Sequence, residues 1–264
     1  MMNISIIIPI HEYNEKISDY LSHAIKSIAN QEGIDEPPQL ILVFPPEIEN
    51  DIKTLVLHNS AIDYVVNVGK TDYQSQVNLA VESVTTDYFS VLEFDDEYST
   101  GYFKNSSAYI KSYPEIDIFL TMMVEVNEKN EGVKITNETV WSQQFVGENG
   151  EMGYLNANAL KQYTDFKLSG AIIKKSEFKN VGKYKSNIKL TFMYEYLLRA
   201  LNNACKVYSM PKIGYKHQMN REGSLFDGYL KNMPVSERKF WFETATNEAN
   251  FINDRVIDMT RLTK

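Results

Sequence analysis

Apolar strands and amphipathic helices alternate through the first hundred residues, and this alternation constrains the fold more than any other feature of the chain. Four apolar runs, at 4–10, 40–44, 62–68 and 88–94, have the length of buried strands. Helical patterns lie between them at 18–30, 48–58 and 74–84. Such alternation is typical of a mostly parallel sheet with helices on both faces. We therefore expect an α/β fold that binds ligands beyond the carboxyl ends of its strands.

The second half of the chain alternates less regularly. The expected elements are strands at 116–126, 170–174, 205–210 and 213–216, a polar hairpin or loop at 127–153, and helices at 191–203 and from about 234. Ser236 is the expected N-cap of the last helix. The sequence contains no repeat and no low-complexity linker, so we expect one body with two lobes and a helical tail.

Composition excludes several classes of protein. The 264 residues are 43% hydrophobic and 23% charged, which is typical of a globular chain rather than a disordered one. The net charge of −8 argues against nucleic-acid binding, which depends on neutralising phosphates, but it allows a small anionic ligand. A single cysteine, Cys205, excludes an intrachain disulfide framework. With no basic leader and no apolar run of about 18 residues, the sequence predicts a cytoplasmic protein without a transmembrane segment.

An acidic cluster at 93–97 follows the fourth predicted strand directly. On an extended segment Glu93 and Asp95 would project from one face, with Asp96 at the following turn. Carboxylates that converge at the end of a strand are suitable ligands for Mg²⁺ or Mn²⁺. The alternative is a solvated acidic turn that caps the next helix. The apolar strand leading into the cluster favours the cation site, because ligands bind at that edge of such sheets.

Four short segments in one order resemble a known family. They are ISIIIPI at 4–10, NLA at 78–80 leading to TTDY at 85–88 and VLEFDD at 91–96, SGAIIKK at 169–175 followed by VGKY at 181–184, and YKH at 215–217 with REGS at 221–224. Together they resemble the family 2 glycosyltransferases, which have the GT-A fold. The resemblance extends over about residues 3–225.

The resemblance implies a nucleotide-diphosphate sugar as donor, most often a UDP-sugar, with Mn²⁺ or Mg²⁺ as cofactor. It implies inverting transfer to a hydroxyl of a glycan or another acceptor. Residues 1–225 would form the GT-A domain, with a nucleotide-sugar half at 1–100 and an acceptor half at 101–225. Residues 226–264 would form a helical extension of the same body.

The resemblance also assigns roles to individual residues. The donor-binding residues would be Pro9, His11, Glu12, Glu93, Asp95, Arg221 and Ser224, and the metal ligands would be Asp95, Asp96 and His217. A phosphate contact is the alternative for His217. Glu93 and Asp95 would take the places of the family's Asp-x-Asp carboxylates. A turn residue without a ligand remains the alternative for His11. Trp141, in the polar segment, is a candidate for stacking on an acceptor.

Two departures from the family pattern affect the expected chemistry. The acidic turn that contacts the base in the family is replaced by FPPE at 44–47. The acidic pair that opens the late helix and supplies the catalytic base is replaced by Phe192 and Met193. Glu195 is the nearest carboxylate and is our candidate catalytic base, provided that the helix begins near Tyr194. It also lies four residues before Arg199, a spacing that favours an ion pair.

Three functions therefore remain in view. The first is a metal-dependent glycosyltransferase. The second is a non-catalytic GT-A module that binds nucleotide or glycan without transfer. A sugar-nucleotidyl transferase is the third, and it is disfavoured because the chain has no Gly-rich basic loop after the first strand.

Overall fold

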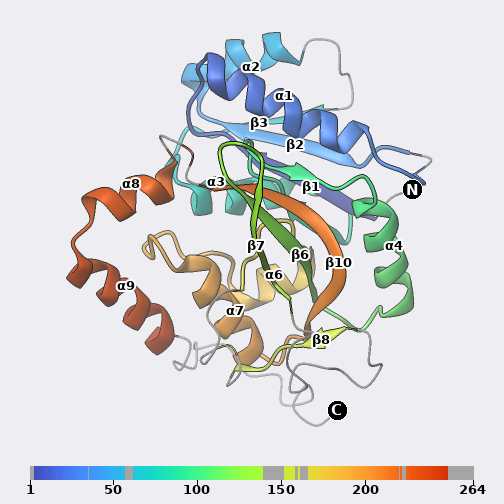
Figure 1. Cartoon of the computed structure of the whole chain (residues 1–264), viewed down its shortest axis with the longest axis vertical. Coiled ribbons are helices and arrows are strands. Elements are labelled where there is room, and N and C mark those ends of the chain that lie inside the picture. Colours follow the sequence, from blue (N-terminus) through green and yellow to red (C-terminus); the bar gives the residue numbers. More distant parts are fainter. Residues whose placement is uncertain are drawn as a thin grey trace.

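The structure is a computed structural model that describes residues 3–34, 36–56, 62–138, 152–157, 160, 166–219, 221 and 224–248, without the side chains of 225–227, 230 and 244–248. It is an α/β fold with a curled, mostly parallel central sheet flanked by helices (Figure 1). The predicted fold class is therefore confirmed. Trp141 lies outside the described residues.

The first half of the chain follows the predicted alternation. Its elements are β1 (Ile4–Pro9), α1 (Glu15–Ala29), β2 (Gln39–Phe44), α2 (Glu49–Leu55), β3 (Ile62–Val66), α3 (Tyr73–Ala80) and β4 (Tyr88–Val91). The strands pair in parallel in the order β3-β2-β1-β4. Local chemistry fixes the helix starts. Asn14 Oδ1 accepts the Ile17 N–H at 3.0 Å, and Asp72 Oδ1 accepts the Ser75 N–H at 2.9 Å.

The second half extends the same sheet. Its elements are β5 (Glu97–Tyr98), α4 (Tyr102–Ser112), β6 (Ile118–Val126), β7 (Gly132–Thr136), β8 (Gly153–Tyr154), β9 (Ile172–Lys174), α6 (Lys175–Val181), α7 (Phe192–Asn202), β10 (Val207–Gln218), α8 (Leu225–Asn232) and α9 (Val235–Glu248). The order continues β4-β9-β6-β10-β5. Strand β9 runs antiparallel to both neighbours, whereas β6 and β10 are parallel to each other.

Two local predictions need correction. The expected strands at 205–210 and 213–216 are one strand, β10, whose register shifts near Ile213. Pro211 interrupts the apolar pattern at this irregularity, which is where a sheet tolerates proline. Helix α9 begins at Val235, so Ser236 lies within the helix rather than at its N-cap. A hairpin of β6 and β7 confirms the first part of the polar segment as a hairpin.

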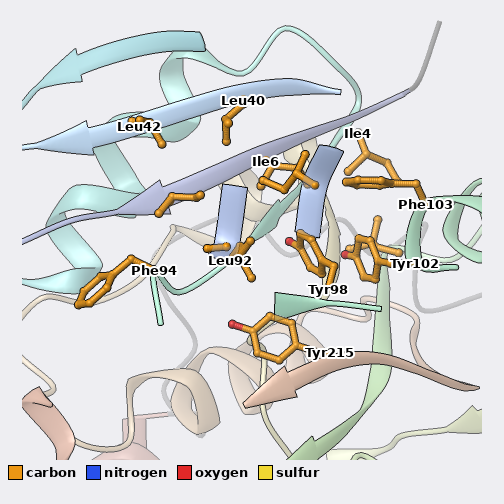
Figure 2. Packing of buried hydrophobic residues seen from close by; sticks show 14 of the residues in the cluster. Ile4, Ile6, Leu40, Leu42, Leu92, Phe94, Tyr98, Tyr102, Phe103 and Tyr215 are labelled. Carbon is orange, nitrogen blue, oxygen red and sulfur yellow. The ribbon is translucent and has the colours of Figure 1, made fainter. Parts of the chain in front are cut away.

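Two apolar clusters, one on each face of the sheet, form the core. Ile7 of β1 belongs to the face covered by α3, α6 and α7, whereas Ile6 and Ile8 belong to the face covered by α1, α2 and α4. Alternate residues of a strand point to opposite faces, so a strand covered on both sides is apolar throughout. Figure 2 shows the second face, where Tyr98, Tyr102 and Tyr215 join the aliphatic side chains of β1 and β2.

The ends of these strands position the site. Gln218 pairs with Val126, so β6 and β10 end together at one edge of the sheet. Strand β4 ends at Val91 and leads into the acidic segment. Among the described residues, the helices are too short or too polar to cross a lipid bilayer.

Candidate functional site

The acidic segment forms a tight turn after β4. The Asp96 N–H donates to the Glu93 carbonyl at 3.0 Å, which places these residues at the first and fourth positions of the turn. We refer to residues 93–96 as the acidic turn. The expectation that Glu93 and Asp95 share one face of an extended segment is wrong, because the strand ends at Val91 and the chain reverses. The turn instead brings Glu93 and Asp96 together.

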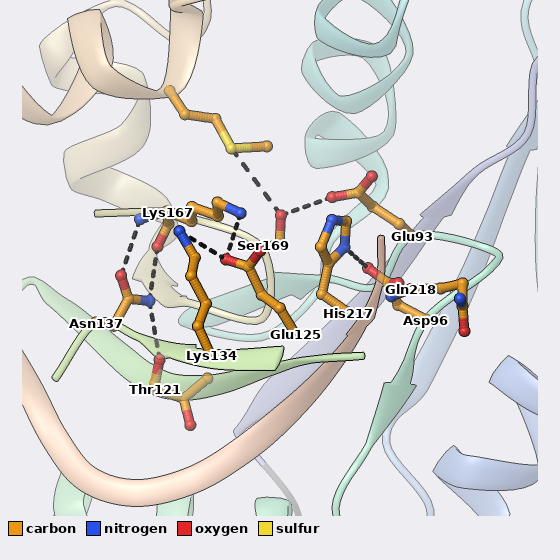
Figure 3. Close-up of polar contacts among 11 residues, drawn as sticks. Glu93, Asp96, Thr121, Glu125, Lys134, Asn137, Lys167, Ser169, His217 and Gln218 are labelled. Carbon is orange, nitrogen blue, oxygen red and sulfur yellow. Dashed lines mark hydrogen bonds and ion pairs between the residues drawn. The ribbon is translucent and has the colours of Figure 1, made fainter. Parts of the chain in front are cut away.

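Two residues at the end of β10 bond the Asp96 carboxylate. His217 Nδ1 lies 3.0 Å from Asp96 Oδ2, and the Gln218 N–H donates to Asp96 Oδ1 at 2.8 Å. Glu93, Asp96 and His217 each present a ligand atom, and these atoms lie within 4.8 Å of one another (Figure 3). The structure thus brings together two of the three predicted metal ligands, Asp96 and His217, with Glu93 beside them.

Burial and charge crowding shape the electrostatics of this cluster. Burial, followed by the charge of the neighbouring carboxylate, raises the pKa of Glu93 above its ordinary value. The pKa of Asp96 is also raised by burial, although His217 opposes the shift. Burial alone would lower the pKa of His217, but the hydrogen bond and charge of Asp96, with the charge of Glu93, raise it to about 9. Negative charge at this site therefore attracts a cation.

The donor set fits a divalent cation. Two carboxylates and one imidazole, with ligand atoms close together, form a donor set that Mn²⁺ accepts, and Mg²⁺ accepts the carboxylates. Ser169 adds support, because its Oγ–H donates to Glu93 Oε1 at 2.6 Å and orients that carboxylate. The residues present could therefore hold the predicted Mn²⁺ or Mg²⁺.

Asp95 lies in a separate ion pair rather than in the ligand cluster. Its Oδ2 is 2.5 Å from Nε of Arg221, whose guanidinium lies 4.9 Å from the centre of the Phe94 ring. Burial and the charge of Glu93 raise the pKa of Asp95, while Arg221 opposes the shift. Arg221 is 9% exposed, so the ion pair is largely shielded from water. Ser224 follows closely, and its N–H donates to the Arg221 carbonyl at 3.1 Å.

The predicted nucleoside-side residues lie near this ion pair. Pro9 ends β1 and is buried, and the His11 ring lies 5.5 Å from the Phe94 ring, centre to centre. His11 Nε2 is 3.5 Å from Glu12 Oε1. Burial lowers the pKa of His11, and the charge of Arg221 lowers it further against the effect of Glu12. The structure therefore places His11, with Arg221, against Phe94.

Glu195 adopts the ion pair that its spacing allowed. Its Oε1 accepts from Arg199 Nε at 2.6 Å, its Oε2 accepts from Arg199 Nη2 at 2.9 Å, and Lys185 Nζ lies 3.3 Å away. The side chain is 0% exposed. Helix α7 begins at Phe192, so the start near Tyr194 that a catalytic base required is wrong. Glu195 sits in the first turn, where its N–H bonds the Thr191 carbonyl, and faces the core.

Met193 of α7 contacts Ser169, the residue that bonds Glu93. Its Sδ lies 4.0 Å from Ser169 Oγ, which in turn bonds Glu93. The position that the resemblance assigns to the family's acidic pair thus lies beside the acidic turn, but it carries a thioether in this chain. A thioether cannot accept a proton at neutral pH.

Sequence reasoning missed several residues that build the site. Tyr215 lies two residues before His217 on β10, and its hydroxyl accepts the Glu93 N–H at 3.1 Å. Strand alternation could have indicated this, since residues two apart share a face. Glu125 lies opposite His217 in register and bonds Lys167 at 2.7 Å. Neither Glu125 nor Lys167 belongs to a motif that identifies it in the sequence.

Comparisons with known proteins support the fold. No protein-family model matches the chain, and no curated protein sequence matches it. Three solved structures of residues 1–349 of S. aureus TarS are similar. The complex with UDP-GlcNAc has a TM-score of 0.67 at 15% identity, and the match covers 94% of this chain and 66% of that one. The complex with UDP has a TM-score of 0.63 at 13% identity, with 94% and 80% covered. The structure without a named ligand has a TM-score of 0.60 at 14% identity, with 94% and 81% covered.

This likeness shows a GT-A-like glycosyltransferase fold. It does not extend to family 2 in particular. The chain spans less than two thirds of the first of these TarS structures and 44% of a longer TarS structure.

Proposed function

We propose that the protein is a metal-dependent glycosyltransferase that moves a sugar from a nucleotide-diphosphate donor to an acceptor hydroxyl, with inversion. The observation that carries the proposal is the position of the Glu93, Asp96 and His217 cluster at the carboxyl edge of a GT-A-like sheet. A TarS structure with this fold is a complex with UDP-GlcNAc, which makes a UDP-sugar the first donor to test. Membership of family 2 and a cytoplasmic location stay predictions.

In this proposal Glu93, Asp96 and His217 hold Mn²⁺ or Mg²⁺. When bound, such a cation neutralises negative charge on the leaving diphosphate. Ser169 holds Glu93 in its ligand orientation, and Gln218 does the same for Asp96 through its backbone N–H. Asp95, the third predicted ligand, is held by Arg221 and would act in donor binding.

The donor would lie along the Phe94 side of the acidic turn. Arg221 brings a permanent positive charge there, which suits the oxygens of a diphosphate. His11 is kept neutral by its lowered pKa and can bond a ribose or base as a neutral group. Pro9, Glu12 and Ser224 complete the proposed donor-binding set. The acceptor, a glycan or another hydroxyl compound, would approach from the side of Met193 and Ser169.

A non-catalytic nucleotide-binding module is the second candidate, and two observations favour it. Both oxygens of Glu195 are engaged by Arg199, and Met193 occupies the place next to the cluster. General-base help is typically worth about 10²–10⁴-fold in rate, so its loss would leave binding without efficient transfer. The two candidates share a donor site and differ only in turnover.

Calorimetric titration with a panel of nucleoside diphosphates, with Mn²⁺ and with chelator, tests the shared donor site. We expect UDP to bind with Mn²⁺ and to bind at least about tenfold more weakly in chelator. Asp96→Asn should reproduce the loss, whereas Asp117→Asn, at the opposite end of β6, should not. Equal UDP affinity with and without metal would contradict the proposal.

Turnover then separates the two candidates. The transferase should release UDP from UDP-GlcNAc or another UDP-sugar in a Mn²⁺-dependent reaction that Asp96→Asn abolishes. The binding module should bind UDP with the same metal dependence and release none from any UDP-sugar tested.

A further inference from the structure

Strand β10 contacts the acidic turn at both ends. At one end, the Tyr215 hydroxyl accepts the Glu93 backbone N–H at 3.1 Å. At the other end, His217 and the Gln218 N–H hold the two oxygens of Asp96. Tyr215 and His217 are two residues apart in a strand, so their side chains leave it on the same face. One strand therefore sets both the start of the turn and its end.

Tyr215 is packed tightly in the core. Its side chain is fully buried, and its ring packs edge-on against Tyr98 with 5.8 Å between ring centres. The backbones of the two residues also pair across β10 and β5. Burial, followed by the charges of Asp96 and Glu93, raises the pKa of Tyr215 well above its usual value. These contacts fix the Tyr215 hydroxyl beside the acidic turn, where it accepts the Glu93 N–H.

The Tyr215 ring packs so closely on the backbone after Ser169 that glycine is required at position 170. Gly170 has φ of +70°, and a Cβ added there would lie 2.3 Å from Cδ2 of Tyr215. A side chain at position 170 would therefore displace the ring. The Gly170 carbonyl accepts from the Tyr102 hydroxyl at 2.8 Å, which fixes this backbone. The same segment carries Ser169, whose hydroxyl bonds the Glu93 side chain, so Glu93 is held at its backbone and at its carboxylate.

We propose that Tyr215 is a positioning residue of the metal site: its ring packs on Gly170, and its hydroxyl holds the Glu93 backbone so that the Glu93 carboxylate lies within ligand distance of Asp96 and His217. Tyr215 would touch neither metal nor donor. The inference rests on the proposed function for the metal, but the hold on the turn exists without it. Sequence motifs do not indicate this role, because the hydroxyl and the amide are 122 residues apart.

Tyr215→Phe tests the proposal, since it removes one hydroxyl and keeps the buried ring. Tyr98→Phe is the matched control, because that hydroxyl lies in the same buried layer but bonds Ser90 rather than the acidic turn or Gly170. Thermal unfolding of both variants in chelator shows that they fold and how far each is destabilised. A purely structural role would predict equivalent effects of the two substitutions on the site.

The first measurement is amide hydrogen exchange by NMR in the metal-free protein. In Tyr215→Phe the Glu93 amide should lose about fivefold to tenfold of its protection, the effect of one lost hydrogen bond, while amides of β1 keep theirs. In Tyr98→Phe the protection of the Glu93 amide should be unchanged. Unchanged protection of Glu93 in Tyr215→Phe would overturn the inference, whatever the metal does.

The second measurement is Mn²⁺ affinity by electron paramagnetic resonance. Tyr215→Phe should weaken Mn²⁺ binding by about threefold to tenfold, and Tyr98→Phe should leave it unchanged. Equal Mn²⁺ affinities in wild type and Tyr215→Phe would also overturn the inference. If the wild type binds no Mn²⁺, the metal-dependent function fails and so does the role of Tyr215 at a metal site; the exchange result then decides only whether Tyr215 holds the turn.

Discussion

His217 Nδ1 lies 3.0 Å from Asp96 Oδ2 and joins two segments that are 121 residues apart in the chain. One partner follows β4 and the other ends β10, so the contact exists only when both strands reach the same edge of the sheet. Asp96 is buried and bonds His217 directly, so each partner alters the pKa of the other. The expected pH dependence of metal binding and of stability follows from this pair.

Mn²⁺ affinity should rise with pH up to about 9. The pKa of His217 is raised to about 9 in the metal-free protein, and an imidazole must lose its proton at the ligating nitrogen to bind a metal. Below pH 9 binding releases that proton, so the Mn²⁺ dissociation constant should fall by up to about tenfold per pH unit between pH 7 and 9. Titrations at several pH values measure this slope. In His217→Gln the slope should be much flatter, and a flat profile in the wild type would exclude His217 as a ligand.

Without metal, the same group should make stability fall as pH rises. A protonated His217 is stabilised by Asp96, so its folded pKa of about 9 exceeds its unfolded value of 6.5. The stabilisation is fully present below pH 6.5 and is lost as pH rises through 9. Urea unfolding in chelator at pH 6.5, 8 and 9 measures the loss. His217→Gln is the control, because only the difference between the two proteins reports this group; parallel curves would contradict the prediction.

Arg221→Lys should weaken UDP binding by about tenfold with metal present. Lysine keeps the positive charge near Asp95 but loses the planar donor fork that suits phosphate oxygens. The charge that remains limits the cost of burying Asp95, so the melting temperature should change by only a few degrees. Lys239→Ala removes an exposed cation of α9 and should change neither quantity. Unaltered UDP affinity in Arg221→Lys would remove Arg221 from the donor site.

Glu195→Gln should lower stability by about 3–5 kcal/mol, because Arg199 would become an uncompensated buried charge. UDP binding by the folded variant should be unchanged. Glu82→Gln is a matched control: Glu82 also pairs with two cations, Lys179 and Lys183, but at the surface, and should cost less than about 1 kcal/mol. Urea unfolding measures both variants. A fully stable Glu195→Gln that has lost only turnover would restore Glu195 as the catalytic base.

Gly170→Ala should destabilise the protein by about 2–5 kcal/mol. Alanine at φ of +70° is strained, and its Cβ would overlap the Tyr215 ring. Gly228→Ala in α8 is the control, because a Cβ there meets no heavy atom of the described residues within 4 Å. The control should be neutral or stabilising by up to about 1 kcal/mol, as expected for alanine in a helix. Similar unfolding midpoints in urea for the two variants would show that Tyr215 is not packed on Gly170 as described.

The sequence by itself determined the frame of this protein. The apolar runs of β1 and β2, buried on both faces, and the caps Asn14 and Asp72 depend on neighbours only a few residues away. Such short-range patterns are readable because strand and helix periods are fixed by backbone geometry. The position of an acidic cluster directly after β4 was predictable for the same reason.

One tertiary contact joins two of the short segments singled out in the sequence. Asn78 of α3 bonds Tyr184 in both directions, accepting its N–H at 3.0 Å and donating to its carbonyl at 2.8 Å. Both residues belong to segments that resemble the glycosyltransferase family. These hydrogen bonds join α3 to the residues that follow α6, a contact that the order of the segments in the sequence does not reveal.

Only the tertiary structure decided which side chains form the site. The turn after β4 paired Glu93 with Asp96 and Asp95 with Arg221, whereas the sequence pattern had grouped Glu93 with Asp95. Helix α7 begins at Phe192, and the Glu195 carboxylate in its first turn therefore faces the core. The register of β10 against β6 and β5 brought His217 and Tyr215 to the turn. Which side chains reach the site depends on strand register and on the residue at which a helix begins, because a shift of one residue turns a side chain in another direction. Packing between distant segments, rather than the local sequence pattern, fixes that register.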